Sequence, residues 1–416
     1  HQWLKFDVVN RPEALDIIGQ EVKPVNVAVL DTGSPYAVDP AFTRSIFDTQ
    51  WGWDMVDNDA LADDDEFPNG SFSHGTHVGS TISMLNDGLD GNGMAARVTP
   101  IRVCASGCPG SATYGAYLYL NGDANDSLTT FAQRSAGQKL HSVNMSYGGS
   151  GGSATSASCV KLGELADRGV LIASSSGNSG VGSVGWPSSC PKVYSVGATN
   201  GTDRRSSYSS TNEYVAFSAP GGEYSDWNAD GIDDLVYAYA RDNSYVQSNN
   251  NGNPMIGAQG TSMASPHGAG FLGLIKYYYE DIVKPFESNT TLPSLLTYVE
   301  VDKMLAANLL TNDVNKEERP NDSVARPGWD EHLGYGIIDL EKAIKAIDSF
   351  QNGYFTSFDT LPYYEGPSTI TLNPEESYTG QFTLTPKGAA GEGFNEVTYT
   401  YAVSYTHLTL PTRSTV

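Results

Sequence analysis

Three short motifs carry residues that together can perform nucleophilic acyl chemistry. Ser262 lies in GTSMASPHGAG, Asp31 ends the apolar run VNVAVLD, and His74 and His77 lie in SHGTHVGST. A serine hydroxyl is a weak nucleophile near neutral pH, so it needs a neighbouring base and a carboxylate that orients that base. The motifs supply candidates for each role, in the chain order Asp, His, Ser.

Each motif also has a plainer interpretation when it is taken alone. Asp-Thr-Gly is ordinary turn chemistry, and small residues around a serine suit a helix that packs tightly against a sheet. Two histidines one helical turn apart are often packing residues. HGTH lacks the spacing and the glutamate of a H-E-x-x-H zinc motif, which disfavours zinc at this pair.

The segments between the motifs predict an alternation of strands and helices. Apolar, β-branched runs predict buried strands at 25–30, 98–103, 141–147, 169–175 and 193–199. The amphipathic stretch VKLGELADRG predicts a helix. This alternation predicts an α/β fold with a parallel sheet covered on both faces. In such a sheet, functional groups gather at the carboxyl ends of the strands, which is where Asp31 lies.

The C-terminal part of the sequence has a different character. Residues 283–335 read as a polar, loop-rich connection, and 329–347 read as a closing turn and helix. Beyond about residue 350, apolar and polar residues alternate, which predicts antiparallel strands. We expect a main domain, the truncated start of a β-sandwich-like domain and a non-native tail, over 1–349, 350–403 and 404–416.

The charge balance excludes several classes of partner. The chain has 24 Lys and Arg against 48 Asp and Glu, a net charge of −24. Such an acidic chain disfavours nucleic acid and anionic membranes. No stretch approaches the roughly 18 apolar residues of a membrane helix, and no signal peptide is visible in a chain that begins at His1. We expect a monomer that binds neither nucleic acid nor membrane.

The four cysteines are Cys104, Cys108, Cys159 and Cys190. An even count in an acidic, lysine-poor chain is typical of an oxidising compartment, so we expect a secreted protein. The first two bracket a short loop, and the last two flank one helix–strand unit. We predict disulfides 104–108 and 159–190. The alternative is four reduced, buried thiols, whereas no His/Cys cluster has the spacing of a zinc site.

The motifs DTG, HGTH and GTSMASPH, in this order, resemble those of the subtilisin-like serine proteases, the subtilases, over roughly residues 20–348. The resemblance implies a doubly wound, mostly parallel α/β fold and peptide hydrolysis through an acyl-enzyme. It implies that Asp31 orients the imidazole, His74 is the general base and Ser262 is the nucleophile. The remaining polar residues of these motifs are then packing residues: His77, Ser265 and His267.

An oxyanion donor is implied in the same way. The strand GVLIASS runs into Gly-Asn, where the family places its oxyanion asparagine, so Asn178 is the expected donor beside the Ser262 backbone N–H. The helix N-terminus adds a positive partial charge. Losing one such donor typically costs about 2.7–4 kcal/mol of transition-state stabilisation.

The resemblance also places the substrate as an extra strand between two segments, Ser146-Tyr147-Gly148-Gly149 and Ser174-Ser175-Ser176-Gly177. Backbone pairing of this kind demands little of the substrate sequence. The P1 pocket would lie between them, floored near Gly185, Trp186 and Pro187. No charge lines these segments, so we expect broad specificity with large apolar or aromatic P1 residues preferred.

Two loops are candidates for structural calcium. SDWNADGIDDLVY places oxygens at alternate positions with a glycine at the turn, and its ligands would be Asp226, Asn228, Asp230, the carbonyl of Ile232 and Asp234. Its twelfth position is Tyr237 rather than Glu. In LNDGLDGNGMA, by the resemblance, the ligands would be Asp87 and the carbonyls of Leu89 and Gly91. The alternative is solvated acidic loops, and the run ALADDDEF at 60–67 also reads as a solvated face. No organic cofactor is expected.

The leading interpretation is therefore a secreted, calcium-stabilised serine endopeptidase that acts on polypeptides, with its own cleaved propeptide as a candidate partner. Acyl transfer to an amine is an alternative within enzymes, but no covering helical lid is evident. An inactive scaffold is a third, against which the intact Asp31, His74, Asn178 and Ser262 argue. Serine-carboxyl peptidases carry glutamate in place of the histidine, and α/β-hydrolases carry G-x-S-x-G.

Overall fold

The computed structural model describes the greater part of the chain. The described residues are 11–18, 24–34, 47–64, 73–84, 93–94, 96–123, 131, 137–150, 152–227, 231–240, 247–248, 254–286, 292–313, 328–352, 355, 357–365, 377–386 and 397–404. Within them, no helix combines the length and the apolar character needed to cross a membrane.

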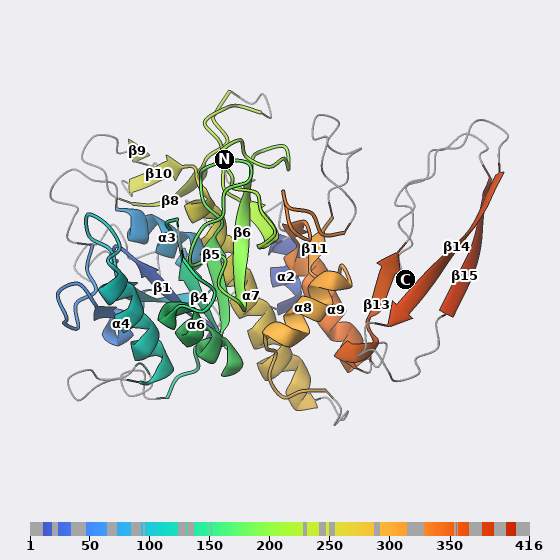
Figure 1. Ribbon diagram of the computed structural model, residues 1–416, viewed down its shortest axis with the longest axis horizontal. Coiled ribbons are helices and arrows are strands. Elements are labelled where there is room, and N and C mark those ends of the chain that lie inside the picture. The colour runs from blue at the N-terminus through green and yellow to red at the C-terminus, as the bar shows by residue number, and fades with distance from the viewer. Residues whose placement is uncertain are drawn as a thin grey trace.

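A nine-stranded sheet forms the centre of the fold (Figure 1). All neighbouring strands pair in parallel except β11 and β12 at one edge, which are antiparallel. From one edge to the other the strands are β11 (Thr311–Asn312), β12 (Ile337–Ile338), β7 (Val215–Pro220), β6 (Val193–Thr199), β5 (Leu171–Ser175), β4 (Ser142–Met145), β1 (Asn26–Asp31), β3 (Arg97–Arg102) and β2 (Trp53–Asp54). Each of the five strands predicted from apolar runs is present.

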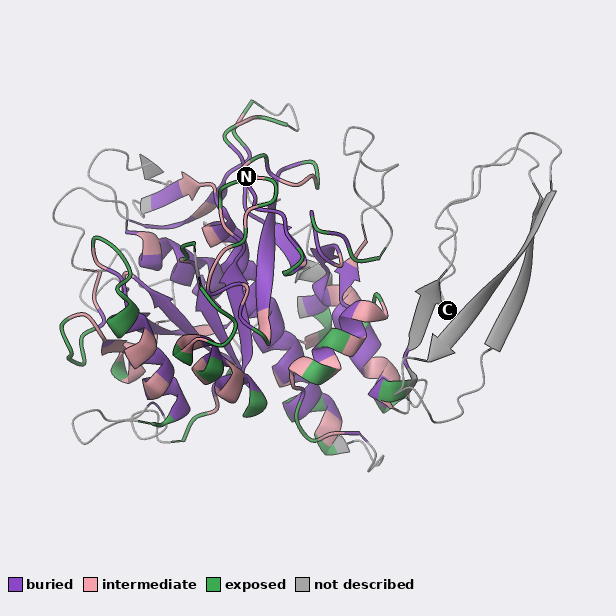
Figure 2. Ribbon diagram, in the orientation of Figure 1, coloured by how far each residue is buried: buried purple, intermediate pink, exposed green. Residues whose placement is uncertain are grey.

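Both faces of the sheet are covered, because alternate residues of each strand point into two different cores. In β1, Val27 and Val29 pack in the core that contains α3 (His74–Ser83) and α7 (Thr261–Tyr277). Ala28 and Leu30 pack in the second core, beneath α4 (Gly110–Asn121) and α6 (Ala157–Asp167). Figure 2 shows the resulting buried centre. The predicted doubly wound α/β fold is therefore confirmed.

The central helix α7 is buried along nearly its whole length and touches β4, β5, β6 and β7. Its many small residues permit this, since a Cβ at Gly273 would lie 2.8 Å from Val25 Cγ1 and 3.0 Å from Ser142 Oγ. The Ser142 hydroxyl donates to the Ala269 carbonyl at 2.7 Å. The helix is thus fixed in depth and register against the sheet, which fixes where its N-terminus emerges.

The direction of winding reverses at β1. The chain passes from β1 to β3 on one side and later to β4 on the other, and β1 pairs with both. At such a switch point the connections leave in opposite directions, which opens a crevice at the carboxyl end of the strand. Asp31 is the last residue of β1, so it stands at that crevice.

The connection from 283 to 335 contains more regular structure than the sequence led us to expect. Helix α8 (Tyr298–Ala306) begins with a capping box in which Thr297 and Glu300 cap each other's backbone N–H groups. Strand β11 follows it. The prediction of a loop-rich connection was therefore wrong for this part, because burial of Val301, Met304 and Leu305 stabilises a helix among polar neighbours.

After β12 the chain forms α9 (Leu340–Gln351), as the sequence predicts, and then the short helix η6 (Phe358–Thr360). Phe358 is buried in the main core, with its ring 4.3 Å from that of Phe350. An antiparallel sheet then forms from β13 (Pro362–Glu365), β14 (Ser377–Pro386) and β15 (Val397–Ser404), in agreement with the predicted antiparallel strands. The remaining short elements are α2 (Arg11–Ile18), η2 (Thr49–Trp51), η4 (Tyr278–Val283), η5 (Lys284–Phe286), β8 (Val236–Tyr239), β9 (Gln247–Ser248) and β10 (Pro254–Ala258).

Both predicted disulfides are present, and neither pairing is exchanged. Cys104–Cys108 closes a loop of four residues' separation at the end of β3, and Cys159–Cys190 ties α6 to the segment before β6 across a separation of 31 residues. The two bonds constrain the unfolded chain to very different extents.

We expect the two disulfides to differ in their contribution to stability. In the chain-entropy model, loss of Cys159–Cys190 costs about 3–4 kcal/mol, whereas loss of the short Cys104–Cys108 loop costs about 2 kcal/mol. Replacing each pair by serines and measuring denaturant unfolding checks this order. A larger loss for the Cys104–Cys108 pair would show that its native contacts, and not loop entropy, dominate.

Candidate active site

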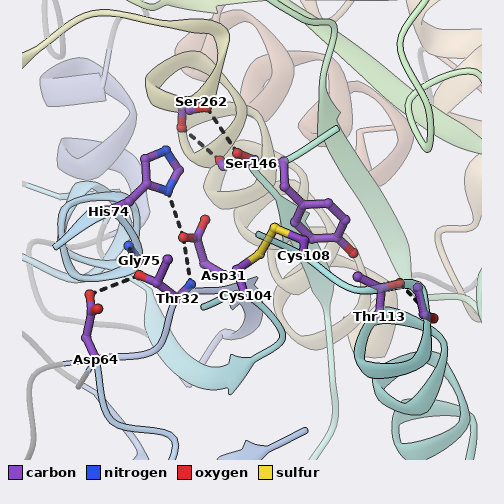
Figure 3. The surroundings of a disulfide bond; sticks show 12 residues. Asp31, Thr32, Asp64, His74, Gly75, Cys104, Cys108, Thr113, Ser146 and Ser262 are labelled. Carbon is purple, nitrogen blue, oxygen red and sulfur yellow. Dashed lines mark hydrogen bonds and ion pairs between the residues drawn. A yellow bond between two sulfur atoms is a disulfide. The ribbon is translucent and has the colours of Figure 1, made fainter. Parts of the chain in front are cut away.

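Asp31 and His74 form the central contact of the site (Figure 3). His74 is the first residue of α3, and its Nδ1 lies 2.7 Å from Asp31 Oδ1. The Asp31 side chain is 2% exposed and that of His74 is 30% exposed. Since Nδ1 donates to the carboxylate, the neutral imidazole carries its acceptor on Nε2, at the opposite side of the ring.

The charge around His74 favours the protonated ring. Burial lowers the pKa of His74, whereas the charge of Asp31, its hydrogen bond and the charge of Asp64 raise it. The net pKa lies above the ordinary value of 6.5. The imidazolium that a general base becomes after it accepts a proton is therefore stabilised at this position.

The backbone beside this pair is packed as closely as glycine allows. At Gly75 a Cβ would stand 2.9 Å from Gly33 N and 3.0 Å from Thr32 N, and closer still to the Gly33 carbonyl oxygen. At Gly33, with φ +117°, a Cβ would stand 2.5 Å from the Asp63 carbonyl oxygen. Gly75 thus lets the start of α3 touch the turn after β1, and Gly33 lets the segment of Asp63 and Asp64 approach the same turn.

The carbonyl of Asp31 is anchored on the other side of the turn. It accepts from Val103 N at 2.8 Å and from Cys104 N at 3.1 Å. Figure 3 shows the Cys104–Cys108 disulfide next to the carboxylate. The short disulfide loop therefore holds the strand end that carries Asp31.

Ser262 lies at the start of α7, beyond the imidazole as seen from Asp31 (Figure 3). Its hydroxyl donates to the Ser146 carbonyl at 3.0 Å, and the Ser146 hydroxyl donates to the Ser262 carbonyl at 2.8 Å. A hydroxyl has one hydrogen, so Ser262 must rotate about χ1 or its C–O bond before it can donate to His74. Catalytic hydrogen bonds commonly form only when substrate is present.

Asn178 is held with a defined orientation. Its Oδ1 accepts from Thr261 N at 2.9 Å and from Thr261 Oγ1 at 2.8 Å. A Cβ built on Gly260 would stand 3.6 Å from Asn178 Nδ2 and 3.6 Å from Ser262 N. The two candidate oxyanion donors therefore lie near one point beside Gly260, where the absence of a side chain leaves room.

Tyr208 is a supporting residue that the sequence analysis missed. Its hydroxyl accepts from Gly260 N at 2.9 Å and lies 2.7 Å from the Gly222 carbonyl and 2.9 Å from the Gly221 carbonyl. It fixes the residue two before Ser262. The signal SSYSS contains nothing that predicts this contact, which joins positions 52 residues apart.

The two segments predicted to hold substrate separate after their last paired residues, Met145 and Ser174. Gly149 exchanges two backbone hydrogen bonds of 2.9 Å with Trp186, and Ser176 N donates to the carbonyl of Val196 at 3.0 Å. Each segment thus turns to a different partner. The residues predicted to form the floor of the P1 pocket lie in the same region, since a Cβ on Gly185 would stand 2.9 Å from the Ser176 carbonyl oxygen.

The other predicted members of these segments are positioned by their neighbours. The Tyr147 hydroxyl lies 2.9 Å from the hydroxyl of Tyr117 on α4. Gly177 N donates to Thr261 Oγ1 at 3.2 Å, which joins this segment to the turn that carries Ser262. Ser175 is buried. A Cβ built on Gly148 would stand 3.0 Å from the carbonyl oxygen of Trp186.

The three polar residues assigned to packing have structural partners. His77 Nε2 lies 3.1 Å from the Val236 carbonyl and 3.0 Å from the Ile256 carbonyl, which ties α3 to β8 and β10. The Ser265 hydroxyl donates to Asn144 Oδ1 at 2.7 Å, and His267 Nδ1 lies 2.8 Å from the Met263 carbonyl. All three are fully buried.

The candidate calcium loop at 225–237 is described in part. Gly231 has φ +92° at the predicted turn, and its N–H donates to Asp226 Oδ2 at 2.8 Å. Asp234 is buried and its Oδ2 accepts from Trp227 N at 2.9 Å. Ile232 lies between them. The other predicted ligands lie outside the described residues: Asn228, Asp230, Asp87, Leu89 and Gly91.

The described part of the 225–237 loop supplies two carboxylates and a carbonyl, which are oxygen ligands of the kind that calcium prefers. One oxygen of each carboxylate accepts a backbone N–H. Across the described residues as a whole, no three His, Cys, Asp or Glu side chains gather closely enough to hold a metal.

Comparison with known proteins agrees with this architecture. The sequence profile described as the subtilase family matches residues 23–336. Alkaline elastase YaB of Bacillus sp. (strain YaB) is 32% identical over 203 residues, which are 49% of this chain and 44% of the elastase. Subtilisin Savinase of Lederbergia lenta is 30% identical over 252 residues, 61% of this chain and 76% of Savinase. The chain therefore belongs to the subtilase family of serine proteases.

The solved structures support the fold. The crystal structure of a lanthipeptide protease superposes with a TM-score of 0.59 at 22% identity, covering 83% of this chain and 94% of that one. The chain spans about half the length of the elastase and of two further proteases that it matches.

The contact between the turn after β1 and the start of α3 can be tested through Gly75. We expect Gly75→Ala to destabilise the fold by about 1–3 kcal/mol, because the added methyl overpacks against the Gly33 backbone. The strong His74–Asp31 hydrogen bond should weaken with it. Denaturant unfolding measures the first effect, and the downfield Nδ1 proton in the NMR spectrum measures the second.

A matched control is Gly110→Ala, at the exposed start of α4, where a built Cβ meets nothing within 4 Å. It should leave both observables unchanged or raise stability slightly. Equal behaviour of the two variants would contradict the proposed close approach.

Proposed function

We propose that the chain is a serine endopeptidase that uses Asp31, His74 and Ser262. The observation that carries the proposal is the 2.7 Å bond between His74 Nδ1 and Asp31 Oδ1 at the carboxyl end of β1, with Ser262 at a helix start beyond the ring. This order of groups is what activation of a serine requires.

In the proposed mechanism, His74 Nε2 accepts the Ser262 proton as the hydroxyl attacks the scissile carbonyl. Asp31 holds the imidazole in the tautomer that leaves Nε2 free to accept, and its charge stabilises the imidazolium. His74 then donates the proton to the leaving amine, and water hydrolyses the acyl-enzyme through the reverse sequence. The raised pKa of His74 supports its role as a proton acceptor near neutral pH.

The negative oxygen of the tetrahedral intermediate would be bound by Asn178 Nδ2 and by Ser262 N. Because Thr261 occupies Asn178 Oδ1 with two hydrogen bonds, the amide is oriented before the substrate arrives. A preorganised donor stabilises the transition state without reorganisation during the reaction. The N-terminus of α7 adds its partial positive charge at the same point.

The substrates would be polypeptides bound in extended conformation along Ser146–Gly149 and Ser174–Gly177. Backbone groups of these segments would supply affinity, with a P1 side chain entering between them toward Gly185. These segments contain no charged residue. That composition supports broad specificity with large apolar or aromatic P1 residues.

The acidic charge and the two disulfides support an extracellular protein. Its membership of the subtilase family leads us to propose its own cleaved propeptide as a partner, and we propose that it works as a monomer. We place the division between the catalytic unit and the C-terminal β unit near residue 350. The segment around Phe358 then packs back on the catalytic unit before β13 begins. Calcium would be held by the 225–237 loop, through Asp226, Asp234 and the carbonyl of Ile232.

The assignment of the nucleophile has a direct test. Ser262→Ala should abolish hydrolysis of unstructured casein and leave the fold unchanged, because it removes only the attacking oxygen. A serine-directed phosphonylating reagent should add mass to Ser262 of the unmodified chain and block cleavage.

The matched control is Ser265, three residues further along the same helix, which should remain unlabelled because its hydroxyl is buried on Asn144. Activity of Ser262→Ala near that of the unmodified chain would overturn the assignment. A folded chain that neither cleaves nor reacts would indicate an inactive scaffold.

The calcium site is tested by stability in the Ser262→Ala background, where autolysis cannot interfere. Calcium at a hundred times its Kd should stabilise the fold by about 2.7 kcal/mol, and a chelator should remove that gain. Asp234→Asn should abolish the calcium dependence. The neighbouring exposed Asp233→Asn should retain it, and equal loss in both variants, or no dependence in the unmodified loop, would contradict the site.

A further inference from the structure

Asp64 lies in the acidic run ALADDDEF, which the sequence analysis interpreted as a solvated face. The structure contradicts that interpretation for this residue, which is partly buried beside the Asp31–His74 pair. Its Oδ2 accepts from the Thr32 hydroxyl at 3.0 Å and from the Thr76 hydroxyl at 3.3 Å. Figure 3 shows the carboxylate next to the turn that carries Asp31.

The contacts of Asp64 form a continuous chain to the backbone of the site. The Thr32 hydroxyl donates to Asp64 and at the same time accepts from Gly75 N at 2.8 Å. Thr32 directly follows Asp31, and Gly75 directly follows His74. The carboxylate therefore orients the Thr32 hydroxyl, and that hydroxyl in turn binds the backbone N–H of Gly75.

The segment that carries Asp64 is itself fixed to the turn after β1. Asp64 N donates to the Ser34 carbonyl at 2.9 Å, and Ser34 N donates to the Ala62 carbonyl at 2.9 Å. A Cβ on Gly33 would stand 2.9 Å from Asp64 N. The backbone of Asp64 is thus held beside this turn, and its carboxylate is held there by the hydroxyls of Thr32 and Thr76.

The charges that face Asp64 are Asp31 from the end of β1 and His74 from the start of α3, with Asp63 adjacent in its own segment. Burial raises the pKa of Asp64 from 3.8 to about 7, and the charge of Asp31 adds to this increase. The hydroxyls of Thr32 and Thr76 and the charge of His74 oppose it. Both carboxylates therefore act on one imidazole, Asp31 through the 2.7 Å hydrogen bond and Asp64 through its charge.

We propose that Asp64 is a positioning residue of the Asp31–His74 pair, which locks the two backbone turns together and whose negative charge supports the imidazolium. The effect of Asp64 on catalysis rests on the proposed function, whereas the effect of Asp64 on the pKa of His74 does not. The Asp64 proton and the His74 proton are coupled, because loss of the first strengthens binding of the second.

The direct test is an NMR titration of His74 in the Ser262→Ala protein, which requires no catalysis. In Asp64→Asn, the amide oxygen can still accept from Thr32 and Thr76, but the charge is gone. The pKa of His74 should fall by about 0.5–1 unit, because the imidazolium loses one nearby negative charge. The titration curve of His74 should also follow a single ionisation, because the coupled ionisation of Asp64 is gone.

Two further variants make the result specific. Asp63→Asn removes the same formal charge one residue away and should leave the pKa of His74 unchanged. Thr76→Val removes one hydrogen bond to the carboxylate, favours its protonated form, and should lower the pKa of His74 in the same direction by less. An unchanged pKa in folded Asp64→Asn, or in Thr76→Val where Asp64→Asn does not fold, overturns the proposal.

A stability measurement gives an independent readout. Since the pKa of Asp64 is higher in the folded chain than in the unfolded chain, its ionisation weakens the fold as pH rises from about 4 to 8. Asp64→Asn in the Ser262→Ala background should gain stability relative to its parent over this range. A difference that stays constant with pH would show that Asp64 does not titrate there.

The catalytic consequence is read from kcat/KM for peptide hydrolysis against pH. The acidic limb should move to lower pH in Asp64→Asn, with kcat reduced and KM little changed, because no substrate contact is removed. An inactive parent chain would refute the proposed function and leave the NMR result standing. An active parent whose limb does not move in Asp64→Asn would refute this inference alone.

Discussion

The site depends on how closely the turn after β1 approaches the first turn of α3. Asp31 is the last residue of its strand and His74 is the first residue of its helix, so a 2.7 Å bond between short side chains requires backbones that nearly touch. Gly75 permits this approach because a Cβ there would collide with the backbone of Thr32 and Gly33, and Gly33 makes room for the 63–64 segment on the other side of the turn. Once this contact is fixed, α7 has to deliver Ser262 beyond the imidazole, and its burial across four strands determines where its N-terminus lies.

Much of this arrangement could be predicted from local sequence. Strand runs such as VNVAVL are apolar at every position because both faces of the sheet are covered, and that composition identifies them. Glycines and small residues in the three motifs report close backbone approach, which is a local requirement with a local signature. The cysteine pairs were also predictable, because each pair lies within one short loop or one helix–strand unit.

The contacts that were missed join residues through space and leave no local signature. The hydroxyl of Tyr208 reaches Gly260 across 52 positions, and nothing near either residue indicates it. Asp64 lies in a run of acidic residues, and nothing in that run distinguishes it in sequence, whereas its hydrogen bonds with Thr32 and Thr76 do so in the structure. Helix α8 is a different case. Its Thr297–Glu300 capping box is a sequence signal, but the polar composition of the surrounding segment concealed it.

At Asp64 the stability of the fold and the support of a positive charge on His74 make opposite demands. A second carboxylate near Asp31 weakens the fold when it is ionised, since burial and like charge both favour its neutral form. An amide would satisfy Thr32 without that penalty. If the residue only joined two turns, a carboxylate would lower stability without any gain. If its negative charge stabilises the imidazolium of His74, that loss of stability has a functional reason. The base beside it must carry a positive charge during reaction, and stability lost at functional positions is commonly balanced elsewhere in the fold.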